Sequence, residues 1–183
     1  MAISEQFTKQ NISDAELMAL PADGYKHELV NGEVTNVPTG NIHDIIVINI
    51  GTALKSSSKG RGYVAGSQAG FRMSNKNIRC PDVSFIRKDR YPDGPPVGFA
   101  EFAPDICVEI ISPSENRSDA LAKVGEYFES GAQLVWHVFP EARRVVVYTS
   151  PIDVITLEAD HILTAGELLS DFHTRVSELL ELE

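Results

Sequence analysis

The chain has only two cysteines, Cys80 and Cys107, among 183 residues, and it has no Cys-x-x-Cys pair. A disulfide framework or a thiolate metal site is therefore not expected, and both residues are predicted to be small buried thiols in a reducing cytoplasm. No apolar run approaches the roughly 18 residues that a membrane helix needs. The first five residues lack the basic start and apolar segment of a signal peptide. We therefore expect a cytoplasmic protein with no membrane partner.

Basic residues are also scarce. Sixteen Lys and Arg residues against 26 Asp and Glu residues give a formal net charge of −10. This charge argues against broad, non-specific affinity for nucleic acid, which depends on an excess of basic charge. It does not exclude a local basic groove, because part of the acidity falls at the C-terminal end, in Glu178, Glu181 and Glu183.

The remaining composition is that of one globular domain. Apolar residues make up 43% of the chain and charged residues 23%, with no long polar tract, internal repeat or linker. We expect a single α/β (α+β) domain over residues 1–183, in which residues 1–12 form a loose leader.

Two short apolar segments each contain one carboxylate. The segment from Pro104 to Ser112 is apolar on both faces except at Glu109, which is typical of a central strand covered on both sides. The segment from Cys80 to Ile86 contains Asp82. A buried, unpaired carboxylate costs several kcal/mol or becomes protonated, and a divalent cation shared by two such groups removes that cost. Oxygen ligands favour Mg²⁺ or Mn²⁺. The alternative is that Asp82 caps the turn after Pro81 and that Glu109 pairs with a lysine or arginine.

The remaining patterns predict helices and strands around these two segments. Ser13 and Glu16 form a capping box for a short helix that ends near Leu20. Asn31-Gly32 is typical of a tight turn between two strands. The other expected elements are a helix over 42–57 capped by Asn41, strands over 63–65, 69–73 and 78–80, a helix over 114–130, a hairpin over 133–148, a strand over 154–157 and a closing helix over 174–182.

The order strand, loop, strand and helix places Asp82 and Glu109 on neighbouring strands, with Lys123 on the helix that follows. Two carboxylates beside an ammonium group suit metal-assisted hydrolysis of a phosphodiester. The metal lowers the pKa of a bound water, and the lysine orients or deprotonates that water or offsets negative charge in the transition state. The backbone carbonyl of Ile110 is a candidate for a further metal ligand. The alternative for Lys123 is a solvated lysine on a helix surface.

Four other features each allow two interpretations. His43 opens the inward-facing stripe of the helix over 42–57, where it is either a site residue or a capping histidine. Tyr127 is either a catalytic phenol or an aromatic residue at the edge of the core. Gln68 either points toward a phosphate or is ordinary strand polarity. The loop over 87–96, with three basic residues and Tyr91, either grips a nucleic-acid backbone or is simply solvated.

These residues resemble a known family. Pro81-Asp82 followed by Glu109-Ile110-Ile111 resembles the signature of PD-(D/E)XK nucleases. More closely, the chain resembles the putative restriction endonuclease family, a bacterial domain of unknown function. The resemblance runs from Asp14 to Val147 and includes the segments 25–33, 108–114 and 131–136 as well as the helix that carries His43.

The resemblance implies a restriction-endonuclease-like core, with a central mixed β-sheet flanked by helices and an N-terminal β-hairpin. It implies Asp82 and Glu109 as metal ligands and Lys123 as the catalytic lysine, and it adds Glu28 and His43 as site residues. For Glu28 the alternative is an ion pair across its own hairpin.

The chain departs from the family pattern in three places. Ile111 replaces the lysine of the superfamily signature, and relatives in the closer family carry that lysine on the next helix. Phe139 replaces an aspartate before Pro140. Lys26-His27 replaces an Arg-Tyr lead-in to Glu28.

The expected function is a Mg²⁺-dependent DNA endonuclease, in which Mn²⁺ can substitute and which forms a homodimer to cut both strands. One alternative, which rests on the net charge and on Ile111, is an inactive nuclease-fold module that binds DNA or a protein partner. Another is a metal-dependent hydrolase of RNA or of small phosphoesters.

Overall fold

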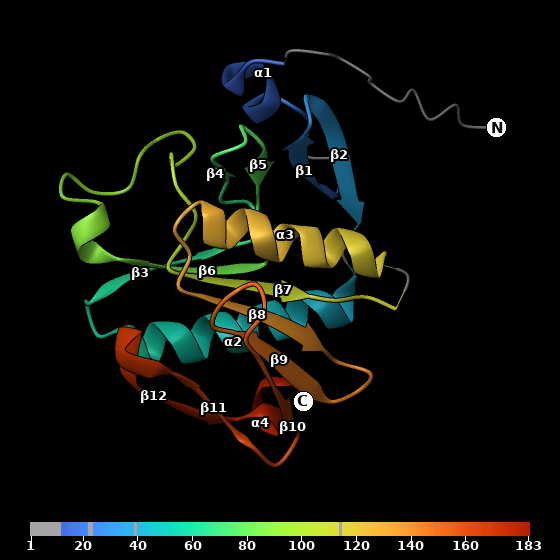
Figure 1. The fold of residues 1–183 in the computed structure, drawn as a ribbon, viewed down its shortest axis with the longest axis vertical. Coiled ribbons are helices and arrows are strands. Elements are labelled where there is room, and N and C mark those ends of the chain that lie inside the picture. Colours follow the sequence, from blue (N-terminus) through green and yellow to red (C-terminus); the bar gives the residue numbers. More distant parts are fainter. Residues whose placement is uncertain (1–11, 22–23, 39, 114) are drawn as a thin grey trace.

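The computed structural model describes residues 12–21, 24–38, 40–113 and 115–183. The expected loose leader therefore lies almost wholly outside the described residues. The described part is an α+β domain built on two β-sheets and a small strand pair (Figure 1). Two longer helices, α2 and α3, cover opposite faces of the larger sheet (Figure 1).

The larger sheet has six strands and is mixed, as expected. Its order is β10-β9-β8-β7-β6-β3; β7 and β8 are parallel, and every other neighbouring pair is antiparallel. All five residues of β7 are buried, which confirms the prediction of a central strand covered on both sides. The strands are β3 (Gly62–Gly66), β6 (Val83–Arg87), β7 (Ile106–Ile110), β8 (Leu134–Phe139), β9 (Arg144–Tyr148) and β10 (Val154–Glu158).

The smaller sheet contains the predicted N-terminal hairpin. Asn31 and Gly32 both have positive φ, 52° and 83°, which is the geometry that the Asn-Gly pair predicts for a tight turn. The hairpin joins the rest of this sheet through one registered pair, Leu29 with Ile78. The sheet has the order β2-β1-β5-β4, with β1 (Tyr25–Val30), β2 (Glu33–Pro38), β4 (Phe71–Arg72) and β5 (Ile78–Arg79).

The helix predicted over 42–57 has the expected apolar stripe, and two further helices form where the sequence predicts them. α1 (Asp14–Met18) begins with the predicted capping box of Ser13 and Glu16. α2 (Asn41–Ser58) buries Ile46, Ile50 and Leu54 against one face of the larger sheet. α3 (Arg117–Glu129) packs Val124 and Tyr127 against the other face. Short 3₁₀ turns lie at Lys88–Arg90 and Gly166–Leu168.

Three helices begin at residues other than those predicted. α2 is capped by Gly40 rather than by Asn41, and α3 begins at Arg117, after Asn116, whose side chain accepts a hydrogen bond from the Ser118 backbone N–H. The predicted closing helix is mostly wrong: α4 (Val176–Leu179) has only four residues, and Thr174 lies within a strand that ends at Arg175. That strand, β12 (Leu169–Arg175), pairs with β11 (Ile162–Ala165), and the pairing satisfies backbone groups that a helix would otherwise satisfy.

Two glycines of the edge strand β3 provide a matched test of packing. In Gly62→Ala the added methyl group would meet the carbonyl oxygen of Ile86 and the ring of Phe85, whereas in Gly66→Ala it would meet open space. We expect Gly62→Ala to lower the free energy of unfolding by about 1–3 kcal/mol. Gly66→Ala should change it by less than about 0.5 kcal/mol. Urea denaturation of both variants tests this, and equal stability of the two would contradict the packing.

Candidate active site

A cavity of about 610 Å³ lies where the two sheets meet α3 and the first turn of α2. The predicted residues Glu28, His43, Asp82, Glu109 and Lys123 all line it. Carboxylates outnumber Lys and Arg side chains in this lining by six to three, so the cavity favours a cation. The six carboxylates are Glu28, Asp82, Glu109, Glu115, Asp119 and Glu126, and the three basic residues are Lys26, Arg79 and Lys123.

Asp82 lies immediately before β6 and is held by three groups. Its Oδ2 atom accepts a hydrogen bond from the Ile110 backbone N–H (2.8 Å) and lies 3.1 Å from His43 Nε2. Its Oδ1 atom accepts a hydrogen bond from Lys26 Nζ (2.8 Å). Burial opposes ionisation, but Lys26 and His43 hold the pKa of Asp82 well below its ordinary value. Asp82 is therefore an ionised carboxylate with a fixed orientation.

Glu109 lies on β7 and faces α3. Lys123 Nζ lies 3.4 Å from its Oε2 atom, and the hydroxyl of Tyr127, one turn along α3, donates a short hydrogen bond to Oε1. Burial raises the pKa of Glu109 above its ordinary value, although Lys123 and Lys26 oppose that shift. Lys123 is itself buried, so it is not a solvated helix lysine. Tyr127 is a core residue that also orients a site carboxylate.

Lys26 joins the two carboxylates, and sequence reasoning did not identify it as a site residue. Its Nζ atom lies 2.8 Å from Asp82 Oδ1 and 4.0 Å from Glu109 Oε2, and its side chain is 1% exposed. Burial disfavours the charge, but Glu109, Asp82 and Glu28 raise the pKa of Lys26 above its ordinary value. Asp82 and Glu109 therefore converge on one positive charge. The alternation of β1, which puts Lys26 and Glu28 on one face, was the available signal.

Glu28 is paired outside its own hairpin, which excludes the alternative of an ion pair across that hairpin. Its Oε2 atom accepts a hydrogen bond from Arg79 Nη1 (3.0 Å) and lies 3.7 Å from Lys123 Nζ, while Oε1 accepts one from the Cys80 backbone N–H (3.0 Å). Burial opposes its charge, but Lys123, Lys26 and Arg79 lower the pKa of Glu28. Arg79 also forms a two-pronged pair with Glu126 of α3, and neither residue was predicted as part of the site.

His43 sits half-buried at the start of α2, between two carboxylates. Its Nε2 atom faces Asp82, and its Nδ1 atom lies 3.2 Å from Asp44 Oδ1. Burial lowers the pKa of His43, but the hydrogen bond and charge of Asp82 outweigh burial and raise it above 6.5. The structure thus brings His43 to the predicted site.

Two further features bear on a metal. Glu115, in the loop before α3, lines the cavity and has a pKa raised by burial; it was not predicted. In the described part of the chain, no three His, Cys, Asp or Glu side chains lie close enough to hold a metal ion. Mg²⁺, however, usually takes only one or two protein carboxylates and completes its shell with water and phosphate oxygens. The donor set of Asp82 and Glu109, which already face one cation, fits such an ion.

Gln68 is not part of this cavity. It lies in the turn after β3, outside any strand, and it lines a different cavity together with Tyr91 of the 87–96 loop. Two of the basic residues of that loop are paired within the chain: Arg87 Nε lies 3.3 Å and Arg90 Nη1 3.5 Å from Asp105 Oδ1.

Comparison with known proteins identifies the family. The model of the family described as Uma2, putative restriction endonuclease, matches residues 14–177. The chain belongs to this family. The matched range includes every residue of the candidate site described above, from Lys26 to Tyr127.

A solved structure supports the fold of this Uma2 chain. The crystal structure of a putative nuclease belonging to DUF820 from Anabaena variabilis ATCC 29413 superposes with a TM-score of 0.79. The match has 21% sequence identity and covers 93% of this chain and 98% of the other. No curated protein matches the chain. Among the described residues, no helix has the length and apolarity to cross a membrane.

The charge of Lys26 should be a large contribution to stability. In Lys26→Met, the buried carboxylates of Asp82 and Glu109 lose the cation between them. Removing one partner of a buried ion pair costs about 3–5 kcal/mol, so the free energy of unfolding at pH 7 should fall by that amount. Urea denaturation measures it, and the exposed Lys55→Met is the matched control. A Lys26→Met variant as stable as Lys55→Met would contradict a structural role for the pair.

The His43–Asp82 contact should make stability depend on pH. Because the pKa of His43 is higher in the folded than in the unfolded chain, folding binds protons at this residue. The stability that protonated His43 contributes to the folded state is therefore fully present below pH 6.5 and is lost as the pH rises through the folded pKa. The stability difference between the wild type and His43→Gln, measured from pH 5 to 9, should be largest at the acidic end. A difference that grows with pH would reverse the assigned sign.

Proposed function

We propose that this protein is a divalent-metal-dependent endonuclease that hydrolyses DNA phosphodiester bonds. The observation that carries the proposal is that Asp82 and Glu109 both face the ammonium group of Lys26, with Lys123 beside Glu109. The excess of carboxylates around the cavity and the family match support it. Cutting both strands of a duplex needs two such sites, so the proposal includes a homodimer on DNA.

Asp82 and Glu109 would hold the metal, and the carbonyl of Ile110 is the further candidate ligand. A bound Mg²⁺ or Mn²⁺ lowers the pKa of a coordinated water and offsets negative charge on the phosphate. Three groups keep the two carboxylates oriented toward such an ion. They are the Ile110 backbone N–H and His43 on Asp82, and the Tyr127 hydroxyl on Glu109. Such support fixes ligand orientation and strengthens metal binding.

Lys123 is assigned to charge stabilisation rather than to proton abstraction. Burial lowers its pKa, but Glu109 and Glu28 outweigh burial and raise it above the ordinary value. The side chain is therefore an ammonium group at neutral pH and has no free base to offer. A positive charge fixed beside the phosphate stabilises the charge that develops in the transition state.

The second candidate is a nuclease-fold module that binds nucleic acid or a protein without cleaving it. Lys26 favours this alternative, because its ammonium group already neutralises the two carboxylates that a metal needs. A metal must then displace Lys26 or bind on the open side of the carboxylates. Metal uptake therefore separates the two functions.

The decisive experiment measures metal binding and cleavage together. Purified protein is titrated with Mn²⁺ by calorimetry and incubated with supercoiled and linear DNA in Mg²⁺ or Mn²⁺. Asp82→Asn and Glu109→Gln should abolish metal uptake and cleavage. Lys123→Met should keep metal uptake but lower the cleavage rate by about 10²–10³-fold, as expected for the loss of one group that stabilises transition-state charge.

Glu141→Gln is the matched control, because Glu141 is an exposed acid in the turn between β8 and β9. It should bind metal and cleave as the wild type does. Normal metal uptake without cleavage of any DNA would refute the nuclease, and no uptake at all would favour the binding module.

A further inference from the structure

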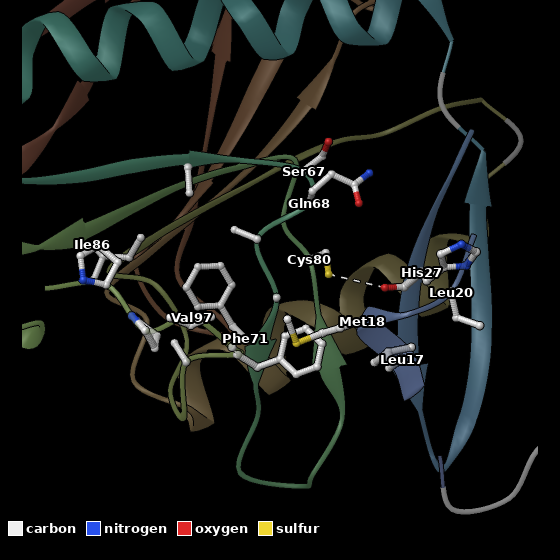
Figure 2. Close-up of a pocket in the computed structure, with 18 of the residues that line it drawn as sticks. Leu17, Met18, Leu20, His27, Ser67, Gln68, Phe71, Cys80, Ile86 and Val97 are labelled. Atoms are coloured by element: carbon white, nitrogen blue, oxygen red, sulfur yellow. Dashed lines mark hydrogen bonds between the residues drawn. The ribbon is translucent and has the colours of Figure 1, made fainter. Parts of the chain in front are cut away.

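A second and larger cavity has a volume of about 940 Å³, and Figure 2 shows side chains that line it. Strand β1 forms a wall of both cavities: Lys26 and Glu28 line the active site, whereas Tyr25 and His27 line the second cavity. Both cavities also reach the start of α2, where His43 lines the active site and its neighbour Asp44 lines the second cavity.

The lining of this cavity is aromatic and nearly uncharged. It contains no Lys or Arg and a single carboxylate, Asp44, so it offers a phosphate no ammonium or guanidinium group and offers a metal only one carboxylate. Its volume lies within the range of about 300–1,000 Å³ typical of small-molecule pockets. The aromatic residues in the lining are Tyr25, Tyr63, Phe71, Tyr91 and Phe99.

Two of these rings are held in place by their neighbours. Tyr63 and Tyr91 have ring centroids 5.6 Å apart, and Tyr91 continues the row to Phe102 at 5.5 Å. The guanidinium of Arg90 lies 3.9 Å from the centroid of Phe102 and donates a hydrogen bond to the Ala103 carbonyl. Tyr63 and Tyr91 are both partly exposed, so the row presents an ordered aromatic surface to the cavity.

Polar groups with spare hydrogen-bonding capacity border the same space. Gln68 and Ser67 have side chains without a hydrogen-bond partner among the described residues, and Gln68 is exposed. Figure 2 shows Ser67 and Gln68 on one side of the cavity and Leu17, Met18 and Phe71 on another. A planar, uncharged ring with donors and acceptors on its edge matches this combination, since such rings stack on aromatic side chains and bond through their edges.

We propose that this second cavity binds an unpaired nucleobase of the strand whose phosphate enters the active site. The inference rests on the proposed nuclease function and names the form of its substrate. The two cavities would bind different parts of the nucleotide: the phosphate would lie in the active site of the proposed function, and the cavity without Lys or Arg would take the base. Turning a base out of a paired duplex costs a few kcal/mol, so single-stranded or mismatched substrates should bind more tightly than fully paired ones.

Photo-crosslinking tests the location without requiring cleavage. Single-stranded oligonucleotides with one 5-iodouracil at successive positions are irradiated with wild-type protein in the absence of divalent metal, and the crosslinked residue is mapped by mass spectrometry. A crosslink at Tyr63 or Tyr91 is expected. Crosslinks found only outside the cavity overturn the proposal.

Binding measurements provide the second arm. Tyr63→Leu and Tyr91→Leu keep apolar bulk but remove the stacking surface, and each should weaken binding of the single strand by about 5- to 150-fold, the range expected for one stacked base. Phe139→Leu is the matched control, because Phe139 lines neither cavity. Thermal unfolding of each variant checks that it is folded. Unchanged binding by both tyrosine variants overturns the proposal and leaves the cavity to an apolar segment of a protein partner.

The outcomes also separate this inference from the proposed function. Crosslinking in the cavity without any Mg²⁺-dependent cleavage supports base binding and refutes the nuclease. Cleavage that the tyrosine variants leave intact, with unchanged oligonucleotide binding, supports the nuclease and refutes base binding. A protein that binds no oligonucleotide refutes base binding directly.

Discussion

The site depends on the mutual neutralisation of charges that are buried together. Asp82, Glu109 and Glu28 are almost fully buried, and Lys26, Lys123 or Arg79 lies within about 4 Å of each of them and offsets the cost of burying a carboxylate. These six side chains come from β1, β5, the residue before β6, β7 and α3. Their electrostatic attraction therefore acts between the elements of the fold as well as within the site.

α3 contributes three side chains to the candidate site, all from one side of the helix. Glu126 and Tyr127 lie three and four residues after Lys123, so all three side chains are on the side of α3 that contacts β5 and β7. Tyr127 is at once a core residue and a donor to Glu109. The packing that fixes the rotation of α3 therefore also sets the position of the Lys123 ammonium group.

Asp82, Glu109 and Lys123 could be predicted as site residues from the sequence. Two apolar strands with one acid each predicted that Asp82 and Glu109 would lie side by side, and the family pattern pointed to Lys123 rather than to Ile111. Lys26 was missed, because alternation in β1 shows which residues share a face but not which sheet that face meets. Arg79 and Glu126 depend in the same way on tertiary contacts.

The elements of the fold were likewise predictable where local sequence decides them and not where tertiary contacts do. The Asn31-Gly32 hairpin, the inward stripe of α2 and the two-side-covered β7 were all predictable from local chemistry. The closing helix was not: Val176, Leu179 and Leu180 have helical spacing, but pairing of β12 with β11 claims Thr174 and Arg175 for a strand. Long-range backbone pairing decided a segment whose local preference pointed elsewhere.

The N-terminal hairpin joins its own sheet through a single registered pair, while Lys26 reaches across to Asp82, before β6, and to Glu109 on β7, and Glu28 lies near Lys123 of α3. The ion pairs of Lys26 with Asp82 and Glu109 therefore hold the smaller sheet against the larger sheet. Any cation that enters and draws Asp82 away from Lys26 also loosens that fastening, so ligand affinity and hairpin docking are thermodynamically linked. The stability of hairpin docking should therefore change with the ligand that the site binds.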